Sequence, residues 1–447
     1  MSVAGFNFSL EELKQMNETV IRMASLQGAS AVESEVSVGF GQDISVRLDE
    51  VETIEYTQDK GVNVTVYFGQ QKGTASSSDL SPQALQDTVE AACNIARYTA
   101  SDEFCGLAQA ERLAKQPLDL ALHHPWHLSV EQAIALAREC EAAALQVDKR
   151  ISNSEGAAVS THQSLFAYAN SLGFNDGYAS SRHGISCSVI AEYRKQMQRD
   201  YWYTTARDAN ALLSPAQVGQ IAGERTVRRL NGRSIKTKQV PVIFEAPIAA
   251  SLISHLVSAI SGGNLYRDSS FLKDTLHQSV MSPCVTILED PHIPGGLASS
   301  PFDYEGVETQ PRTLIDQGVL QGYMLSSYSA RKLGMQTTGN AGGNHNLIVQ
   351  SQDYDFEGLL QLMGTGLLVT ELLGQGVNMV TGDYSRGAAG FWVENGKIAY
   401  PVEEITIAGN LSTMFKQIVA IANDTLISGS KQIGSVLIEQ MTVAGNQ

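Results

Sequence analysis

A single histidine occupies the middle of an expected helix, in a setting that could hold a metal. Residues 240–246 predict a strand, and residues 250–263 have the apolar spacing of a helix with His255 at its centre. A zinc site on such a helix needs two ligands about one turn apart, with a carboxylate beside them as general base. The nearest carboxylates, Glu245 and Asp268, lie on the strand and beyond the helix, and the chain contains neither HExxH nor HExxxH. We therefore interpret His255 as a packed or hydrogen-bonded residue.

The cluster HHPWH is a second candidate for chemistry, since it places the imidazoles of His123, His124 and His127 within five residues. Such a group could bind a metal, but no carboxylate or thiol stands beside it to complete a ligand set. We interpret it as a solvated loop before the helix that Ser129 begins. The chain also lacks a GxSxG elbow, so the sequence defines no serine-hydrolase triad.

Two glycine-rich stretches are candidate binding sites. Residues 337–349, TTGNAGGNHNLIV, lack the Lys-Ser/Thr pair of a P-loop and the GxGxxG spacing of a dinucleotide site. They predict a tight loop that another backbone approaches closely. Residues 380–410 place Asp383, Tyr384 and Arg386 among small residues. That stretch predicts either a sheet edge that accepts an extended peptide or a glycine-rich turn with a structural Asp–Arg pair.

Charge and cysteine content limit the class of protein. The chain has 447 residues and a net charge of −16, which argues against nucleic acid as a ligand. We interpret its densest basic stretches, 224–233 and 235–239, as the face of a linker. The cysteines are odd in number and contain no CxxC pair, as expected for reduced thiols in the cytoplasm. No signal peptide or membrane span is expected, because the run 241–260 is interrupted by polar residues.

The elements that must position these residues form an α+β fold. Helices are expected to begin at Ser9, Ser81, Ser129 and Ser214, each a capping serine. Strand clusters lie between them, and hairpins are expected at 312–325 and 390–402, the second with Asn395-Gly396 as its turn. We predict antiparallel sheets in both halves. The predicted domains are a mixed helix and antiparallel-sheet domain, 1–232, and a strand-rich, glycine-rich domain, 233–447.

The longest distinctive stretch, residues 363–411, contains GDYSRGAAGFWVENGKIAYPVEEITIAGNL and closely resembles the C-terminal signature of the TldD/PmbA family. The chain resembles in particular the PmbA, or TldE, branch, once labelled modulator of DNA gyrase. Further matching stretches are 73–85, 189–208, 296–307 and 326–346. The resemblance spans nearly the whole chain and implies the two-domain TldD/PmbA-like fold.

The resemblance implies proteolysis of unfolded peptides in the bacterial cytoplasm by a pair of subunits. In that family the TldD-type subunit binds zinc through HExxxH and a later cysteine. Here the corresponding helix positions hold Ser254, His255 and Ala259, where the family motif has His, Glu and His. No cysteine follows Cys284. The resemblance therefore implies no metal or cofactor in this chain, with zinc in the partner.

These observations lead to a first hypothesis of a metal-free subunit that pairs with a TldD-type zinc-bearing subunit, or with itself when alone. Inactive by itself, it would dock unfolded peptides in a chamber, without contact to nucleic acid or membrane. The residues expected to line the chamber are Asn340, Gly342, Gly343, Asn344, Asp383, Tyr384 and Arg386. A second hypothesis is a non-enzymatic regulator or scaffold. A third is a self-sufficient peptidase that uses the histidines of HHPWH.

Overall fold

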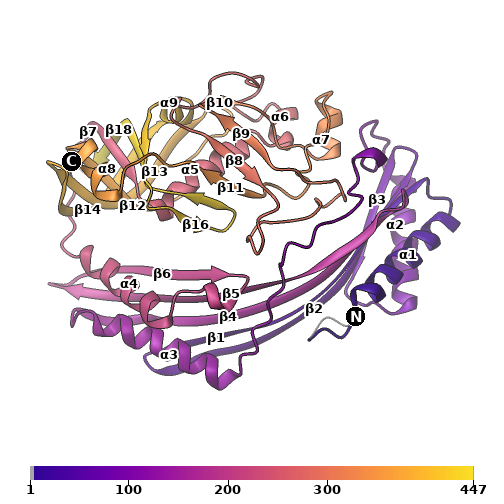
Figure 1. The fold of residues 1–447 in the computed structure, drawn as a ribbon, viewed down its shortest axis with the longest axis horizontal. Coiled ribbons are helices and arrows are strands. Elements are labelled where there is room, and N and C mark those ends of the chain that lie inside the picture. Colours follow the sequence, from indigo (N-terminus) through magenta and orange to yellow (C-terminus); the bar gives the residue numbers. More distant parts are fainter. Residues whose placement is uncertain (1–4, 446–447) are drawn as a thin grey trace.

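The computed structural model describes residues 5–445 as two lobes. The N-terminal lobe (5–228) has one six-stranded sheet, and the C-terminal lobe (238–445) has two (Figure 1). The nine α-helices of the described chain are α1 (Leu10–Leu26), α2 (Pro82–Tyr98), α3 (Val130–Gln146), α4 (Pro215–Arg228), α5 (Ala246–Ala259), α6 (Gly262–Tyr266), α7 (Ser327–Lys332), α8 (Phe356–Met363) and α9 (Leu411–Lys416).

The first sheet is antiparallel throughout and has the order β3-β2-β1-β4-β5-β6. Its strand β1 runs without a break through 17 residues, 31–47. The six strands are β1 (Ala31–Arg47), β2 (Glu50–Phe68), β3 (Gln71–Ser77), β4 (Ile151–Asn170), β5 (Asn175–Tyr193) and β6 (Gln196–Ala206).

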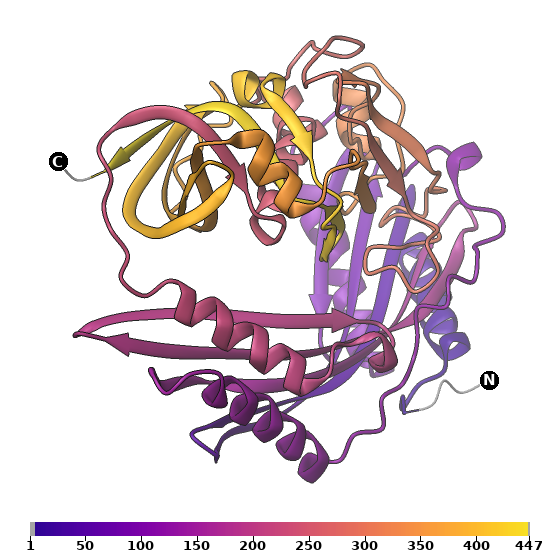
Figure 2. The ribbon, with the colours of Figure 1, turned by 60° about the vertical axis from the view of Figure 1, so that its left-hand side comes forward.

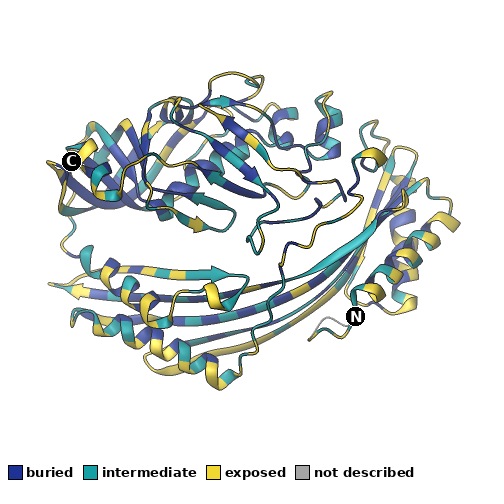
Figure 3. Cartoon of the chain, viewed as in Figure 1, coloured by how far each residue is buried: buried dark blue, intermediate teal, exposed yellow. Residues whose placement is uncertain are grey.

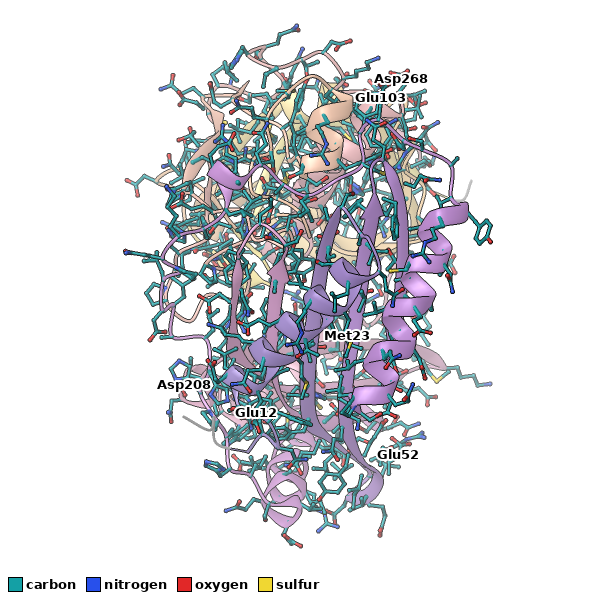
Figure 4. All side chains as sticks on the ribbon, turned by 90° about the vertical axis from the view of Figure 1, so that its right-hand side faces the viewer. Glu12, Met23, Glu52, Glu103, Asp208 and Asp268 are labelled. Atoms are coloured by element: carbon teal, nitrogen blue, oxygen red, sulfur yellow. The ribbon has the colours of Figure 1, made fainter. Side chains whose placement is uncertain are left out.

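Four helices cover one face of this sheet, because alternate residues of its long strands are apolar. Along β1, Val32 and Val36 pack with α1 and α2, whereas Ile44 and Val46 pack with α3 and α4. Figure 3 shows the resulting alternation of burial along the strands. Figure 4 shows α1 and α2 over the face of the sheet that the helices cover, with Glu12 near the beginning of α1 and Met23 near its end.

The predicted helix starts are confirmed. The side chains of Ser9, Ser81, Ser129 and Ser214 each accept a hydrogen bond from a backbone N–H in the first turn of their helix. Asn395 and Gly396 have positive φ angles of 51° and 71°, which form the predicted hairpin turn.

The C-terminal lobe has two mixed sheets, so the prediction of antiparallel sheets in both halves is wrong for this lobe. Its parallel pairs are β7 with β12 and β11 with β17. One sheet has the order β10-β9-β8-β11-β17-β16: β8 (Ile287–Asp290), β9 (Arg312–Asp316), β10 (Val319–Leu320), β11 (Asn346–Val349), β16 (Leu426–Ser428) and β17 (Lys431–Ile433). The other, β14-β13-β12-β7-β18-β15, also joins β14 to β18: β7 (Lys238–Phe244), β12 (Gly366–Leu373), β13 (Asp383–Glu394), β14 (Lys397–Asn410), β15 (Ile418–Ile421) and β18 (Val436–Gly445).

Helix α5 follows β7, as predicted, and is packed into the core of the C-terminal lobe. Leu252, Leu256 and Ile260 on its apolar stripe are at most 1% exposed. Alternate residues of β7 serve two clusters, since Val242 packs with α5 and Ile243 packs with α8 on the other side. Packing on both sides therefore holds β7 and α5 in place, and the polar side of α5 faces away from this core.

One segment connects the lobes, and a loop of the N-terminal lobe contacts the C-terminal lobe. Residues 229–237 run from α4 to β7 (Figure 2), and the predicted domain boundary at 232–233 falls within them. Residues 99–129 cross from α2 to α3, and Leu113 forms a β-bridge with Val307 on the way. The guanidinium of Arg331 donates to three carbonyl oxygens of that crossing segment, between 104 and 107. No helix within residues 5–445 is long and apolar enough to cross a membrane.

Candidate functional site: a cavity between the lobes

A cavity of about 780 Å³ lies between the two lobes. Strand β6 and helix α4 bound it on the N-terminal side. Helix α5, strands β12 and β13 and the β16–β17 hairpin bound it on the other (Figure 1). Its lining includes Asp200, Tyr201, Tyr203, Arg225, Ser251, Ser254, Glu371, Arg386, Ile427, Ser428 and Lys431.

Two sheet edges meet this cavity. Among the described strands, β6 pairs only with β5, and β16 pairs only with β17. The two edges approach each other where the hydroxyls of Tyr203 and Ser428 lie 3.2 Å apart. An edge strand carries backbone N–H and C=O groups without a partner strand, so it can pair with another extended chain. The cavity is thus bounded on both sides by backbone that can accept a further strand.

Helix α5 presents Ser251 and Ser254 to the cavity, while the half-buried His255 is not part of its lining. The His255 ring lies 6.0 Å from the Tyr384 ring, and its Nε2 has no hydrogen-bond partner within the described chain. Burial, together with the nearby charge of Arg386, lowers the pKa of His255, so the ring is neutral at pH 7. The interpretation of His255 as a packed residue is confirmed.

The helix position that corresponds to the family's zinc motif does not fit zinc. Ser254 donates its hydroxyl to the carbonyl of Ala250 at 3.1 Å, and Ala259 has only a methyl group. His255 is the one nitrogen donor of the three, whereas catalytic zinc takes three protein ligands. Residues 5–445 contain no group of three or more His, Cys, Asp or Glu side chains that could hold a metal ion.

The histidines of HHPWH lie in a loop with separate partners. His123 shares a hydrogen bond of 2.8 Å with the Gln163 amide, and His124 bonds the carbonyl of Ala121 at 2.8 Å. His127 is exposed. The three rings therefore do not converge on one point, in keeping with their interpretation as a loop.

Strand β13 corrects both expectations for residues 383–386. It is not a free edge, because β14 pairs with it on one side and residues 376–378 cover the other: the Ser385 N–H donates to the Gly376 carbonyl at 2.7 Å. Nor does Asp383 pair with Arg386, since its carboxylate accepts from Thr381 and Asn410. Gly376 allows the backbone of residues 376–378 to lie close to β13, because a Cβ at this position would be 1.8 Å from the Ser385 carbonyl oxygen.

Tyr384 and Arg386 are two positions apart on β13, so their side chains project from the same face; Tyr384 is buried and Arg386 lines the cavity. Tyr384 is 1% exposed, and burial raises the pKa of its hydroxyl to about 12, although the adjacent Arg386 charge works in the other direction. Arg386 lines the cavity, and its Nε has no hydrogen-bond partner among the described residues. Of the seven predicted chamber residues, Arg386 is the one that the structure places on the cavity wall.

The other glycine-rich stretch lies away from this cavity and holds a buried polar cluster. The Asn340 amide donates to Glu289 at 2.8 Å, and its oxygen accepts from Arg312 at 2.9 Å. Burial raises the pKa of Glu289, but the hydrogen bonds from His345 and the charge of Arg312 outweigh burial and lower this pKa to about 2. Gly342 packs against the Tyr304 ring. Gly343 accepts from Asn340, and Asn344 donates to Ser430, next to Lys431.

Sequence reasoning missed two parts of the cavity wall. The basic stretch 224–233 lies in the linker only from residue 229 on: Arg225 belongs to α4, is 9% exposed and pairs with Glu245 at 2.9 Å. Arg229, next to the end of α4, pairs with Glu371 across the lobes. The second part is the exposed aromatic pair Tyr201 and Tyr203, whose rings stack at 6.4 Å. The two tyrosines are two positions apart in the sequence, which places both rings on one face of a strand, and this spacing was the signal that could have found them.

Comparison with known proteins identifies the fold and the family. The metalloprotease PmbA of Escherichia coli O157:H7 is 49% identical over 433 residues, which cover 97% of this chain and 96% of that protein. A PmbA homologue of Haemophilus influenzae is 48% identical, with 98% and 97% covered. A crystal structure from Bacteroides thetaiotaomicron, described as a candidate modulator of DNA gyrase, matches with a TM-score of 0.93 at 26% identity, covering 98% of this chain and 99% of that one.

The shared fold defines a class of two-lobed α+β proteins. Family models of the PmbA/TldA metallopeptidase match in three parts: domain 1 over residues 33–96, the central domain over 123–230 and the C-terminal domain over 237–445. The chain therefore belongs to the PmbA/TldD metallopeptidase family, which confirms the resemblance drawn from its sequence.

Proposed function

We propose that this chain is the metal-free subunit of a two-chain cytoplasmic metallopeptidase that processes or degrades unfolded peptides. Its partner is a TldD-type subunit that carries the zinc ion, and the chain pairs with itself when that partner is absent. Its own contribution is to receive a peptide in the cavity between its lobes and to hold it for cleavage. The membership of a metallopeptidase family and the poor fit of Ser254, His255 and Ala259 to zinc support this division of labour.

One observation carries the docking role: the same cavity is bounded by two strands, each with one edge that pairs with no other strand of residues 5–445. An extended peptide pairs with a sheet edge through its backbone, so binding selects unfolded chains and tolerates many sequences. The edge of β6 offers residues 201–205, and the β16 edge offers 426–428. Arg386 remains in the proposed set of peptide contacts as a wall residue. The other six predicted chamber residues would act by holding the surrounding loops.

Cleavage of an unstructured peptide tests the division of labour. The chain alone is expected to be inactive, the zinc-loaded partner alone slow, and the mixture active and sensitive to a chelator. Chelator-sensitive cleavage by this chain alone would overturn the proposal and turn attention to His123, His124 and His127. A mixture no faster than the partner alone would favour the regulator or scaffold hypothesis.

Filling the cavity tests the docking role. Ser251→Trp places an indole on the cavity wall and is expected to abolish stimulation of the partner. Ser258→Trp is the matched control, because Ser258 is a half-buried serine of the same helix outside the cavity lining. Thermal unfolding of both variants separates blocked docking from misfolding. Full stimulation by a folded Ser251→Trp chain would contradict docking in this cavity.

A further inference from the structure

The cavity contains two cations that the described chain does not neutralise. Arg225, the third cation of its lining, is paired with Glu245 and lies 3.4 Å from Asp200. Arg386 and Lys431 have no carboxylate oxygen within 4.0 Å among residues 5–445. This is unusual in a chain with 47 acidic and 31 basic residues. A half-buried cation without a counter-charge costs free energy unless a ligand supplies the charge.

The acidic side chains of the cavity are already occupied. Asp200 lies 3.4 Å from Arg225 and 3.6 Å from Arg229, and Glu371 pairs with Arg229. They have no free charge to offer Arg386 or Lys431. The lining thus separates into a neutralised side, on α4 and β12, and an uncompensated cationic side, on β13 and β17.

Two ionisable neighbours of Arg386, His255 and Tyr384, are neutral. Burial keeps His255 uncharged at pH 7, and Tyr384 keeps its proton because its pKa is raised to about 12. The guanidinium has an unpartnered Nε and lies in a partly desolvated site. A guanidinium in such a site binds a carboxylate with two parallel hydrogen bonds, which an uncharged group cannot reproduce.

Lys431 is a second cation of the same kind. Its ammonium group donates to the Ser430 hydroxyl at 3.2 Å, and burial lowers its pKa. The exposed side chains of Tyr201, Tyr203 and Ile427 provide an apolar surface in the same cavity. The complementary ligand is an extended chain with apolar side chains and carboxylate groups.

We propose that Arg386 and Lys431 form a carboxylate-binding subsite, which makes the cavity selective for peptides that carry Asp or Glu side chains or a free C-terminal carboxylate. This inference rests on the proposed docking of peptides between the lobes. It adds the substrate class, since backbone pairing alone would not distinguish acidic peptides from neutral ones. Both carboxylate sources offer the same chemistry, and the experiment separates them.

Fluorescence anisotropy of four dansyl-labelled peptides tests the proposal with the full chain alone. All four share an unstructured sequence of Gly, Ser, Leu and Tyr, with either two Asp or two Asn, and with either a free or an amidated C-terminus. The peptide with two Asn and an amidated C-terminus is expected to bind at least about tenfold more weakly than the peptide with two Asp and a free C-terminus. Added salt is expected to reduce that difference. The peptide with two Asp and an amidated C-terminus, and the peptide with two Asn and a free C-terminus, show whether the subsite binds side-chain carboxylates or the terminal carboxylate.

Variants locate the selectivity. Arg386→Gln and Lys431→Gln are each expected to lose about tenfold in affinity for the acidic peptide, so that the acidic peptide binds no better than the neutral one. Lys431→Arg is expected to retain the preference. Lys115→Gln, which removes an exposed cation outside the cavity lining, is expected to change neither affinity.

The outcomes separate this inference from the function on which it rests. Equal affinity for all four peptides, abolished by Ser251→Trp, would overturn the subsite and leave peptide docking intact. An acidic preference that survives both Gln variants would also overturn it. Binding of none of the peptides would overturn the subsite and the docking role together.

Discussion

Asp303 holds a buried carboxyl group whose proton is retained close to neutral pH. Its oxygens accept from the backbone N–H groups of Glu305, Val307 and Ala341 at 2.9–3.0 Å. Burial, followed by the charge of Glu305, outweighs these bonds and raises the pKa of Asp303 to about 7. In the unfolded chain such a group loses its proton near pH 4. The folded state therefore binds an extra proton between about pH 4 and 7, and this group's stabilisation is lost as pH rises through about 7.

Glu305→Gln tests this coupling. Gln can still accept the hydrogen bond from the Ser327 N–H, but it removes the charge next to Asp303. Burial also raises the pKa of Glu305 itself, so the variant is expected to gain stability relative to the natural chain as pH rises from 5 to 8 from two sources: the loss of this titration, and about 1.4 kcal/mol for each unit by which the pKa of Asp303 falls. Denaturant unfolding of both proteins across this range measures the gain, and titrating histidines cancel in the difference. Glu308→Gln, an exposed neighbour, is expected to show no such gain. A pH-independent difference would contradict the raised pKa.

Helices α3 and α4 pack closely because α4 has glycines at the contact. A Cβ at Gly219 would lie 2.0 Å from the Cys140 carbonyl oxygen, and one at Gly223 would lie 2.8 Å from the Ala144 oxygen. The small residues on both helices therefore set how near α4 lies to α3. Since α4 carries Arg225 and ends next to Arg229, this contact also positions the neutralised side of the cavity.

Gly219→Ala is expected to destabilise the chain by about 1–3 kcal/mol, because the methyl group must push two helix backbones apart. The midpoint of denaturant unfolding measures the loss. Gly263→Ala is the control, since its Cβ would meet only the flexible end of Arg267, at 3.2 Å. Equal midpoints for the two variants would show that the helices separate without cost.

The lobes are held in place by a buried network of charges on the cavity wall. Glu245, at the beginning of α5, bonds Arg225 at 2.9 Å and Arg228 at 2.8 Å, so it ties the C-terminal lobe to α4. The pKa of Arg225 is raised, because Glu245 and Asp200 outweigh the effect of burial. The Arg229–Glu371 pair makes a second tie between the lobes.

Glu245→Ala leaves Arg225 buried with only the more distant Asp200 as its counter-charge. The loss of a partner from a buried pair is expected to cost about 3–5 kcal/mol. Thermal and denaturant unfolding measure the loss. Arg199→Ala removes an exposed ion pair with Glu155 and is expected to cost less than about 1 kcal/mol. If the two variants unfolded alike, the buried network would not hold the lobes.

The sequence alone determined the local structure of this protein. The capping serines set where α1 to α4 begin, and Asn395-Gly396 set the β13–β14 turn, because these signals act between residues within one turn of each other. The distinctive stretch at 363–411 was enough to indicate the family, which the comparisons confirm.

Only the tertiary structure decided which residues face the cavity. Tyr203 and Ser428 are 225 positions apart, and Arg229 and Glu371 are 142 apart, so no local pattern could pair them. The sequence suggested a free edge at Asp383–Arg386, but residues 376–378 cover that edge, and the strands that line the cavity with an edge unpaired by any described strand are β6 and β16. The physical reason is that a strand edge or a charge counts as free only when the whole chain leaves it without a partner.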